Sequence, residues 1–356
     1  MNHFDKHKAT AIEAMEQAQH IAFGPFIFQA TRVLTKSGIL AAIEKTKDGL
    51  EESEIQSAVN LSKYAIRVLL QAGLGIGLLI FKNGKYNITD VAYFILNDKL
   101  TKVNMDFVHD VCYNGMYFLE ESFRNGRPEG LKVFGPWPTL YEGLANFPEQ
   151  VRKSWLAFDH YYSDFSFPEL LPIIFRDKPK SILDIGGNTG RWALQCFEHD
   201  KDVAVTILDL PGQVNLARQK IDEHGFSNRI RFHEADVLKE ETIFPKGFDI
   251  VWMSQFLDCF SEEQITSILK RCHQAINPEG CVYILELFWD RQRFRASAFA
   301  LQQTSLYFTA MANGNSQMYN SEVFYKCIEE AGFEIVEQKD QIGVSHSLLK
   351  CRPKTV

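Results

Sequence analysis

Cysteine is sparse in this chain and shows no pattern. The 356 residues include seven cysteines, an odd number, and no two of them form a C-x-x-C pair. An odd and dispersed set argues against a disulfide framework and against a cysteine-based zinc site. The ten histidines show no metal-ligand spacing either. These absences predict reduced thiols, a cytoplasmic protein and no bound metal.

Long apolar runs are also missing. No stretch reaches the roughly eighteen apolar residues that a transmembrane helix needs. Residues 1–6 lack the apolar core of a secretion signal. We therefore expect neither secretion nor a membrane partner.

The apolar content that is present suffices for more than one core. Apolar residues make up 46% of the chain and aromatic residues 13%. A length of 356 residues exceeds the roughly 250–300 that one core usually serves. We expect a helical domain over residues 1–100, a helical connector over 101–175 and an α/β domain over 176–356.

A glycine-rich turn in the α/β part is the most informative segment. A buried-strand pattern over 181–185 leads into Gly186, Gly187 and Gly190, and a helical pattern begins at Arg191. Glycine is needed where the backbone takes a positive φ or where a ligand approaches closely. The dinucleotide fingerprint G-x-G-x-x-G would need a glycine at position 191. The spacing D-x-G-x-x-x-G fits instead, which favours a nucleotide-handling loop that seats no pyrophosphate.

Four consecutive strand patterns lead into an aspartate. The carboxylates are Asp184, Asp209, Asp236 and Asp258, at or after the patterns over 181–185, 203–208, 230–233 and 248–253. Ligands of open parallel sheets bind outside the carboxyl ends of the strands. The set therefore predicts a Rossmann-like sheet with helices on both faces and one acidic binding rim.

These motifs resemble the class I S-adenosyl-L-methionine (SAM) dependent small-molecule O-methyltransferase family, typified by plant phenolic methyltransferases and their bacterial relatives. The resemblance rests on the loop 184–190, the segment Asp209-Leu-Pro211, the helix pattern 261–272 with the turn 277–280, and the segment 330–333. It implies that SAM is the methyl donor and that the fifth strand covers 281–286.

The resemblance also implies which residues bind SAM. The expected contacts are Asp184, Gly186 and Gly187 for the amino-acid part, Asp209 with Leu210 for the ribose, and Asp236 with Val237 for the adenine. Ser254 stands where the family often has a lysine, and we expect a contact there too.

The N-terminal third contains four helical patterns and a hairpin. The helices are expected over 8–34, 36–46, 52–59 and 62–74, and Asn83-Gly84 between two apolar runs signals a hairpin. Three short helices and a hairpin make a winged-helix module. In the resembled family such a module is a dimerisation domain, which implies a homodimer.

A winged helix can also bind DNA, and that alternative is disfavoured by charge. The candidate recognition helix offers only Lys63 and Arg67, next to Glu51, Glu52 and Glu54, and the net charge is −7. Phosphate contacts supply most non-specific DNA affinity, so a surface with few cations is a poor match. We expect no nucleic-acid partner.

Aromatic residues are dense between positions 100 and 175. In the resembled family this connector and the helix after the fifth strand line the acceptor pocket, which implies a small aromatic or quinone-like acceptor. The expected pocket residues are Phe158, Tyr162, Phe299 and Tyr307, with Phe308 and Met311 as further candidates.

One position departs from the family pattern. The family's general base is a histidine, and alignment on Ser261-Glu-Glu263 places Asp258 there. One of the family's two flanking glutamates is retained as Glu286, whereas the second falls near Met318. An ordinary aspartate titrates roughly 2.6 pH units below a histidine, so burial and the neighbouring Glu286 must raise the pKa of Asp258 if it is the base.

Three functions therefore stay open. The first is an O-methyltransferase with Asp258 and Glu286 as catalytic residues, whose acceptor hydroxyl is acidic enough to need only Asp258 or no base at all. The second is a C- or N-methyltransferase on a similar ring, and the third is a non-catalytic SAM-binding dimer or regulator. His109, His160 or His346 could also replace the missing base.

Overall fold

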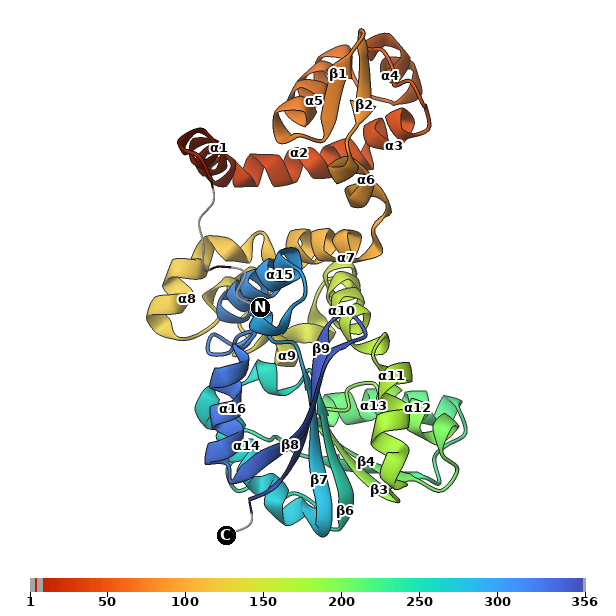
Figure 1. The fold of residues 1–356 in the computed structure, drawn as a ribbon, viewed down its shortest axis with the longest axis vertical. Helices are drawn as coiled ribbons and strands as arrows, with labels where there is room; N and C mark the ends of the chain where they lie inside the picture. Colours follow the sequence, from red (N-terminus) through yellow and green to blue (C-terminus); the bar gives the residue numbers. More distant parts are fainter. Residues whose placement is uncertain (1–3, 5–8, 355–356) are drawn as a thin grey trace. The chain divides into compact units, whose positions relative to one another are not determined.

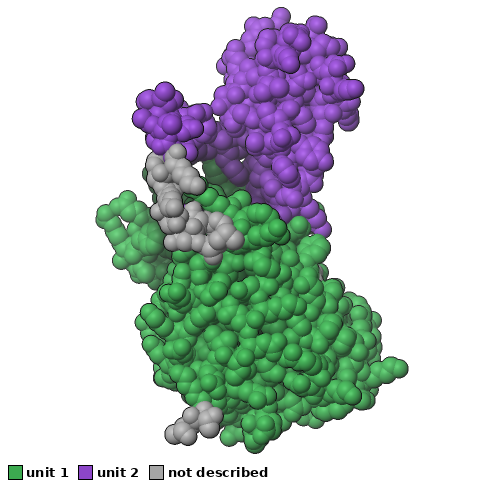
Figure 2. All heavy atoms as spheres, in the orientation of Figure 1, with its two compact units in different colours: residues 1–3, 107–356 green, residues 4–106 purple. Residues whose placement is uncertain are grey.

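The computed structural model describes Phe4 and residues 9–354, and for residues 163 and 164 the backbone alone. The chain divides into two compact units, Phe4–Asp106 and the unit that contains Phe107–Val356 (Figure 2). The division falls slightly after the boundary expected at residue 100. Residues 107–175, expected as a connector, belong to the same unit as the sheet.

The unit Phe4–Asp106 is helical with one hairpin. Its elements are α1 (Ala11–Ala22), α2 (Gly24–Lys36), α3 (Ile39–Glu44), α4 (Glu52–Ala58), α5 (Lys63–Ile76), β1 (Leu79–Lys82), β2 (Lys85–Ile88), α6 (Asp90–Asn97) and α7 (Lys99–Phe107), which ends at the boundary. The hairpin is confirmed, and Asn83 and Gly84 both have positive φ, as a two-residue hairpin turn requires. Apolar residues of α2 to α6 and both strands form the core of this unit.

The single helix expected over 8–34 is wrong, because the chain forms two helices there. Helix α1 ends at Ala22, and α2 begins at Gly24 with Pro25 in its first turn. Proline has no N–H to donate into a preceding turn and its ring displaces the carbonyl four residues earlier, so a new helix starts at that point. Position 8 itself lies outside the described residues.

The unit that contains Phe107–Val356 is built on a seven-stranded sheet. Its strands are β3 (Ser181–Ile185), β4 (Ala204–Asp209), β5 (Ile230–Glu234), β6 (Phe248–Ser254), β7 (Ile276–Glu286), β8 (Phe333–Ile342) and β9 (His346–Pro353). The order is β5-β4-β3-β6-β7-β9-β8, with β9 antiparallel to its neighbours and the first five strands parallel. The strand order reverses at β3, which is the position where open α/β sheets bind ligands.

Nine α-helices and several short turns complete the described part of this unit. The helices are α8 (Leu119–Asn125), α9 (Leu140–Gly143), α10 (Glu149–Asp164), α11 (Phe167–Ile174), α12 (Arg191–His199), α13 (Pro211–Glu223), α14 (Glu262–Ala275), α15 (Arg295–Tyr307) and α16 (Ser321–Glu330). The π-helical turns are Val108–Cys112 and Phe308–Ala312, and the 3-10 turns are Gly115–Phe118, Glu129–Val133, Leu144–Asn146, Phe175–Asp177, Leu257–Cys259 and Trp289–Arg291.

Alternation along the strands explains why helices cover both faces (Figure 1). Val251 and Met253 of β6 pack with α14 and α16, whereas Ile250 and Trp252 pack with α11, α12 and α13. Successive side chains of a strand point to opposite faces, so an uninterrupted apolar strand needs cover on both sides. Trp252 stacks on Trp192 of α12 with ring centroids 4.4 Å apart.

Strand β7 is longer than expected. It begins at Ile276, opposite Phe248, and then shifts register so that Cys281 pairs with Ile250. The segment 277–280, expected as a turn after the helix, therefore lies within the strand as an irregularity.

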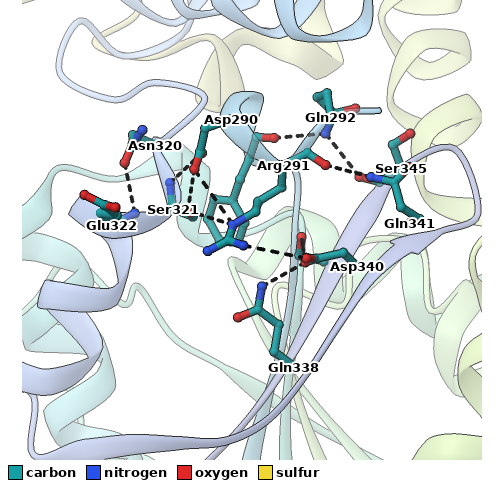
Figure 3. Close-up of polar contacts among 12 residues, drawn as sticks. Asp290, Arg291, Gln292, Asn320, Ser321, Glu322, Gln338, Asp340, Gln341 and Ser345 are labelled. Atoms are coloured by element: carbon teal, nitrogen blue, oxygen red, sulfur yellow. Dashed lines mark hydrogen bonds and ion pairs between the residues drawn. The ribbon is translucent and has the colours of Figure 1, made fainter. Parts of the chain in front are cut away.

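A polar network fixes the chain after β7 (Figure 3). Asp290 accepts hydrogen bonds from the backbone N–H of Ser321 at 2.8 Å and from its hydroxyl at 2.5 Å, and Arg291 Nε donates to Ser321 Oγ at 3.0 Å. Gln292 Nε2 donates to the carbonyl of Ser345 at 3.2 Å. The contacts join the turn Trp289–Arg291 to α16 and to the β8–β9 connection, and so set the path from β7 into α15.

The N-terminal cap of helix α14 was predicted from the sequence. Ser261 caps the helix as expected: its hydroxyl accepts the N–H of Gln264, and the Gln264 side chain accepts the N–H of Ser261. We predict that Ser261→Ala lowers the free energy of unfolding by about 1 kcal/mol, measured by urea denaturation. Ser267→Ala, in the interior of the same helix, is the control and should cause no loss. Equal stability of the two variants would contradict the assignment of the cap.

Candidate functional site

The loop after β3 has the backbone that its glycines predicted. Gly186, Gly190 and Asn188 have φ of 77°, 75° and 47°, in the left-handed region. A Cβ at Gly186 would overlap the ring of Phe256, which packs over the loop. Position 186 therefore needs glycine both for its conformation and for the close approach.

Asp209 at the end of β4 holds this loop. Its Oδ2 accepts the N–H of Asn188 at 2.9 Å, and its Oδ1 accepts the N–H of Leu210 at 2.7 Å. Burial raises the pKa of Asp209 to about 6, while the two hydrogen bonds act in the opposite direction. Each oxygen keeps a lone pair for a ligand.

Asp184 is buried beneath the loop. A Cβ at Gly187 would lie 2.8 Å from Asp184 Oδ2, and that oxygen has no hydrogen-bond partner among the described residues. Burial, and then the charge of Asp209, raise the pKa of Asp184 to about 8. A buried carboxyl oxygen without a partner is costly, and it marks a place where a donor from a ligand would be favourable.

A cavity of about 530 Å³ opens at the carboxyl ends of the parallel strands. Of the residues expected to bind SAM, those that line it are Gly186, Asp209, Leu210, Asp236 and Val237. The expected residues that do not line it are Asp184, Gly187 and Ser254. Ser254 is the last residue of β6, and its hydroxyl is buried without a partner.

The opposite side of the cavity is largely aromatic. Phe158, Tyr162, Tyr307 and Phe308 line it. Phe299 does not: it is 58% exposed and lies about 80° around the axis of α15 from Tyr307. Met311, the remaining candidate, is buried and does not line the cavity.

Two cavity residues on α10 were missed in the sequence. Trp155 and Asp159 line the cavity with Phe158 and Tyr162, and the four positions have the spacing of one helical face. That spacing was the available signal. Trp155 Nε1 also donates to the hydroxyl of Tyr307 at 2.8 Å, which joins α10 to α15 across the cavity wall.

Asp258 reaches the cavity from a sharp turn after β6. Gln255 takes a positive φ of 47°, and the buried Glu286 accepts the N–H of Phe256 at 3.1 Å and that of Leu257 at 2.9 Å through one oxygen, Oε1. Asp258 lines the cavity although only 6% of its surface is exposed. Glu286 does not line the cavity, and its contacts are those of a residue that holds the turn.

Asp258 has a short chain of donors behind it. The thiol of Cys259 donates to Asp258 Oδ1 at 3.5 Å, and the hydroxyl of Tyr141 donates to Cys259 Sγ at 3.0 Å. Tyr141 and Cys259 also line the cavity. Thiols are weak donors, so Asp258 keeps most of its capacity to accept a hydrogen bond from a ligand.

Burial shifts both carboxyl groups at this turn. It raises the pKa of Asp258 to about 6, and it raises the pKa of Glu286 well above its usual range, with the charge of Asp258 acting in the same direction. Two neighbouring carboxylates resist joint ionisation, so the pair holds a proton more readily than an isolated carboxylate does.

The three candidate replacement histidines lie elsewhere. None of them lines the cavity. His346 is fully buried at 2.8 Å from Gln255 Oε1, and burial lowers its pKa to about 4. His109 pairs with Asp110 at 2.6 Å, and His160 lies 3.8 Å from Asp159.

Metal and membrane signals can be checked within the described residues. In residues 9–354 and at Phe4, no group of three or more metal-ligating side chains comes together. None of the helices in the described part combines the length and apolar character needed to cross a bilayer. Arg67, a candidate phosphate contact, pairs with Glu52 at 3.0 Å.

Family comparison identifies the class. An O-methyltransferase domain model matches residues 119–334, which is more than half of the chain, and a Dimerisation2-like domain model matches residues 15–86. The chain belongs to the O-methyltransferase domain family, and it is a SAM-dependent methyltransferase.

Individual relatives differ in what they methylate. L-tyrosine C(3)-methyltransferase of Streptomyces lavendulae is 25% identical over 90% of this chain and 87% of its own. 3-Hydroxy-5-methyl-1-naphthoate 3-O-methyltransferase of Streptomyces sahachiroi is 26% identical over 76% of each chain. Human N-acetylserotonin methyltransferase, solved in complex with SAM, has a TM-score of 0.65 at 19% identity over the full length of both chains.

The site fits SAM. The cofactor carries an ammonium group, a sulfonium centre and ribose hydroxyls, all of which favour acidic surroundings or acceptors. The structure offers Asp209 and Asp236 on the cavity wall, and the partnerless oxygen of Asp184 beneath the glycine loop.

Asp184 gives this site a pH signature. The folded protein holds the Asp184 proton more tightly than the unfolded chain, since the pKa is raised to about 8. The resulting stability is present at pH 4 and is lost as the pH rises toward 8. We predict that the free energy of unfolding of Asp184→Asn falls by on the order of 2 kcal/mol less than that of the wild type between pH 5 and pH 8. Denaturant unfolding without ligand measures both. Asp202→Asn, at an exposed position, is the control. If the wild type and both variants lose stability in parallel as the pH rises, Asp184 does not hold a proton in the folded protein.

Proposed function

We propose that the protein transfers a methyl group from SAM to a hydroxyl of a small aromatic or quinone-like acceptor, with Asp258 as the general base. The observation that carries the proposal is the position of Asp258. It is a nearly buried carboxylate on the cavity wall, close to aromatic side chains, with one weak donor as its side-chain partner.

Methyl transfer from SAM requires the protein mainly to align the two reactants and to remove the acceptor proton. SAM supplies a methyl group that is already activated by its positive sulfur. The aromatic walls formed by Phe158, Tyr162 and Tyr307 support a flat acceptor and exclude water. In this role the Asp258 carboxylate takes the proton of the acceptor hydroxyl.

The remaining residues of the turn position this base. Glu286 holds the backbone at Phe256 and Leu257, and the Tyr141–Cys259 chain orients Asp258 Oδ1. Asn313 Nδ2 donates to the carbonyl of Cys259 at 2.7 Å, which ties the turn to the segment after α15. We propose that Glu286 positions Asp258 by holding the backbone of the turn.

A C- or N-methyltransferase on a similar ring is the alternative. The name of the Streptomyces lavendulae relative, L-tyrosine C(3)-methyltransferase, supports it. An aspartate that orients an amine or a phenol would serve that reaction as well. Mass spectrometry of the product, with fragmentation that locates the new methyl group, separates the two.

Asp258 provides the direct test of the base. We predict that Asp258→Asn lowers the turnover number by about 10²–10⁴-fold, because the variant removes the nearly buried carboxylate that takes the acceptor proton in this proposal. In the wild type the rate should fall as the pH drops through about 6, where Asp258 becomes protonated. Transfer of a labelled methyl group from SAM to a panel of phenols and hydroxyquinones measures both effects.

The control separates chemistry from binding. Asp258→Asn should keep its affinity for S-adenosylhomocysteine within about threefold in calorimetry, and the exposed Asp202→Asn should keep wild-type rates. If Asp258→Asn kept the wild-type turnover number at every pH, Asp258 would not be the general base.

We further propose that the protein is a homodimer assembled through α1 and α2. Helix α1 buries none of its residues within the described chain, although it carries Ile12, Met15 and Ile21. Ile21 and Phe26 are 81% and 73% exposed. Exposed apolar patches of this kind are typical of protein interfaces, and the Dimerisation2-like match over 15–86 includes most of these residues.

The mass in solution tests the dimer. Light scattering should give twice 40.8 kDa for the wild type, and Ile21→Glu with Phe26→Glu should shift the protein toward 40.8 kDa. Gln17→Glu with Gln19→Glu, both exposed on α1, adds the same two charges and is the control. A wild-type mass of 40.8 kDa at all concentrations would contradict the homodimer.

We also propose a cytoplasmic location, which the seven unpaired cysteines support. Recovery of the native protein from a secreted fraction would contradict it.

A further inference from the structure

The cavity wall carries charge of one sign. The carboxylates that line it are Glu142, Asp159, Asp209, Asp236 and Asp258. Among the described residues that form the wall, no lysine, arginine or histidine is present. The nearest histidine in sequence to these acids, His160, lies 3.8 Å from Asp159 and does not line the cavity.

Three of these carboxylates differ in exposure. Asp258 is nearly buried, Asp159 is half-buried and Glu142 is exposed. Asp159 accepts a hydrogen bond from Asn188 at 3.4 Å, and Asp258 has the weak thiol of Cys259 as its side-chain donor. A carboxylate oxygen can accept about two hydrogen bonds, so Asp258 keeps capacity for a donor from a ligand.

The charge of bound SAM does not balance this set. With one carboxylate, one ammonium and one sulfonium, SAM carries a net charge of about +1, whereas five carboxylates line the cavity. A positive group on the acceptor would therefore be attracted, and a carboxylate on the acceptor would meet like charges in a partly dry site. The aromatic side chains Trp155, Phe158 and Tyr162 add their electron-rich faces, which also favour a cation.

We propose that the acceptor is an aromatic compound with a protonated amine, selected by Glu142, Asp159 and Asp258, and that analogues with a carboxylate are rejected. The inference rests on the proposed function in that it takes this cavity as the acceptor site. It sets the chain apart from its relatives named for L-tyrosine and for a naphthoate, since both of those compounds carry a carboxylate.

The test uses three phenols whose two-carbon side chain ends in a cation, a neutral methyl group or an anion. Tyramine is the cation, 4-propylphenol is neutral, and 3-(4-hydroxyphenyl)propanoate is the anion. Calorimetry measures the dissociation constant of each for the full-length protein saturated with S-adenosylhomocysteine at pH 7.5. We expect tyramine to bind at least tenfold more tightly than the anion, with the neutral compound between them. In 0.5 M salt we expect the differences between the three dissociation constants to become smaller.

Charge-removing variants assign the selectivity to this wall. Glu142→Gln and Asp159→Asn should each reduce the ratio between tyramine and the anion by about threefold or more, with the affinity for 4-propylphenol unchanged. Glu149→Gln removes the same charge from an exposed position at the start of α10, outside the cavity, and should leave the ratio unchanged.

The outcomes separate the inference from the function on which it rests. Lack of S-adenosylhomocysteine binding would count against the proposed site. Retained binding with no preference for tyramine, including no binding of any of the three phenols, would overturn the charge selectivity. A preference that survives both cavity variants would overturn the assignment to Glu142 and Asp159.

Discussion

The buried carboxyl group of Glu286 is the contact on which the site depends. Strand β6 ends at Ser254, and the chain must turn at once to bring Asp258 onto the cavity wall. That turn leaves the N–H groups of Phe256 and Leu257 without strand partners, and one oxygen of Glu286 accepts both. Each buried donor left unsatisfied would cost about 1–3 kcal/mol. The same turn places the ring of Phe256 against Gly186, so Asp258 and the glycine loop after β3 are positioned together.

Burial of acids at the sheet edge has a cost in the protein alone. Burial raises the pKa values of Asp184, Asp209 and Asp258, which means that the ionised forms are disfavoured without a ligand. Bound positive charge would reverse that penalty, because an opposite charge favours ionisation. Folding stability and cofactor binding are therefore linked through these acids. A ligand that binds only the folded chain raises the free energy of unfolding.

Much of the fold was predictable, because local patterns and tertiary packing agree. The glycines of the loop after β3, the hairpin at Asn83-Gly84 and the cap at Ser261 each have one low-energy backbone solution, and the structure contains all three. The break before Pro25 was missed because amphipathic spacing continues through it, although the proline was a visible signal.

The site was predictable on the side that the strands supply. Strand ends in a parallel sheet meet at one edge, so the positions of Asp209 and Asp236 followed from the order of the elements. The acceptor side is formed by α9, α10 and segments that follow β6 and β7, whose meeting depends on packing between distant residues. For that reason Asp159 and Trp155 were missed, and Phe299, although aromatic and near in sequence to Tyr307, lies outside the cavity.

The proposed base is an aspartate where the family pattern led us to expect a histidine, and burial makes the two comparable in pKa. An exposed aspartate titrates about 2.6 units below a histidine, which would make it a poor base near neutral pH. Burial at the turn raises the pKa of Asp258 to about 6, close to the ordinary value of about 6.5 for histidine. The two bases also differ in charge. Histidine becomes a cation when it takes a proton. In the proposed role Asp258 would become neutral at the stage when the positive sulfur of the methyl donor also loses its charge. It would therefore leave no new cation in the cavity, and its negative charge would be present only while the donor is positive.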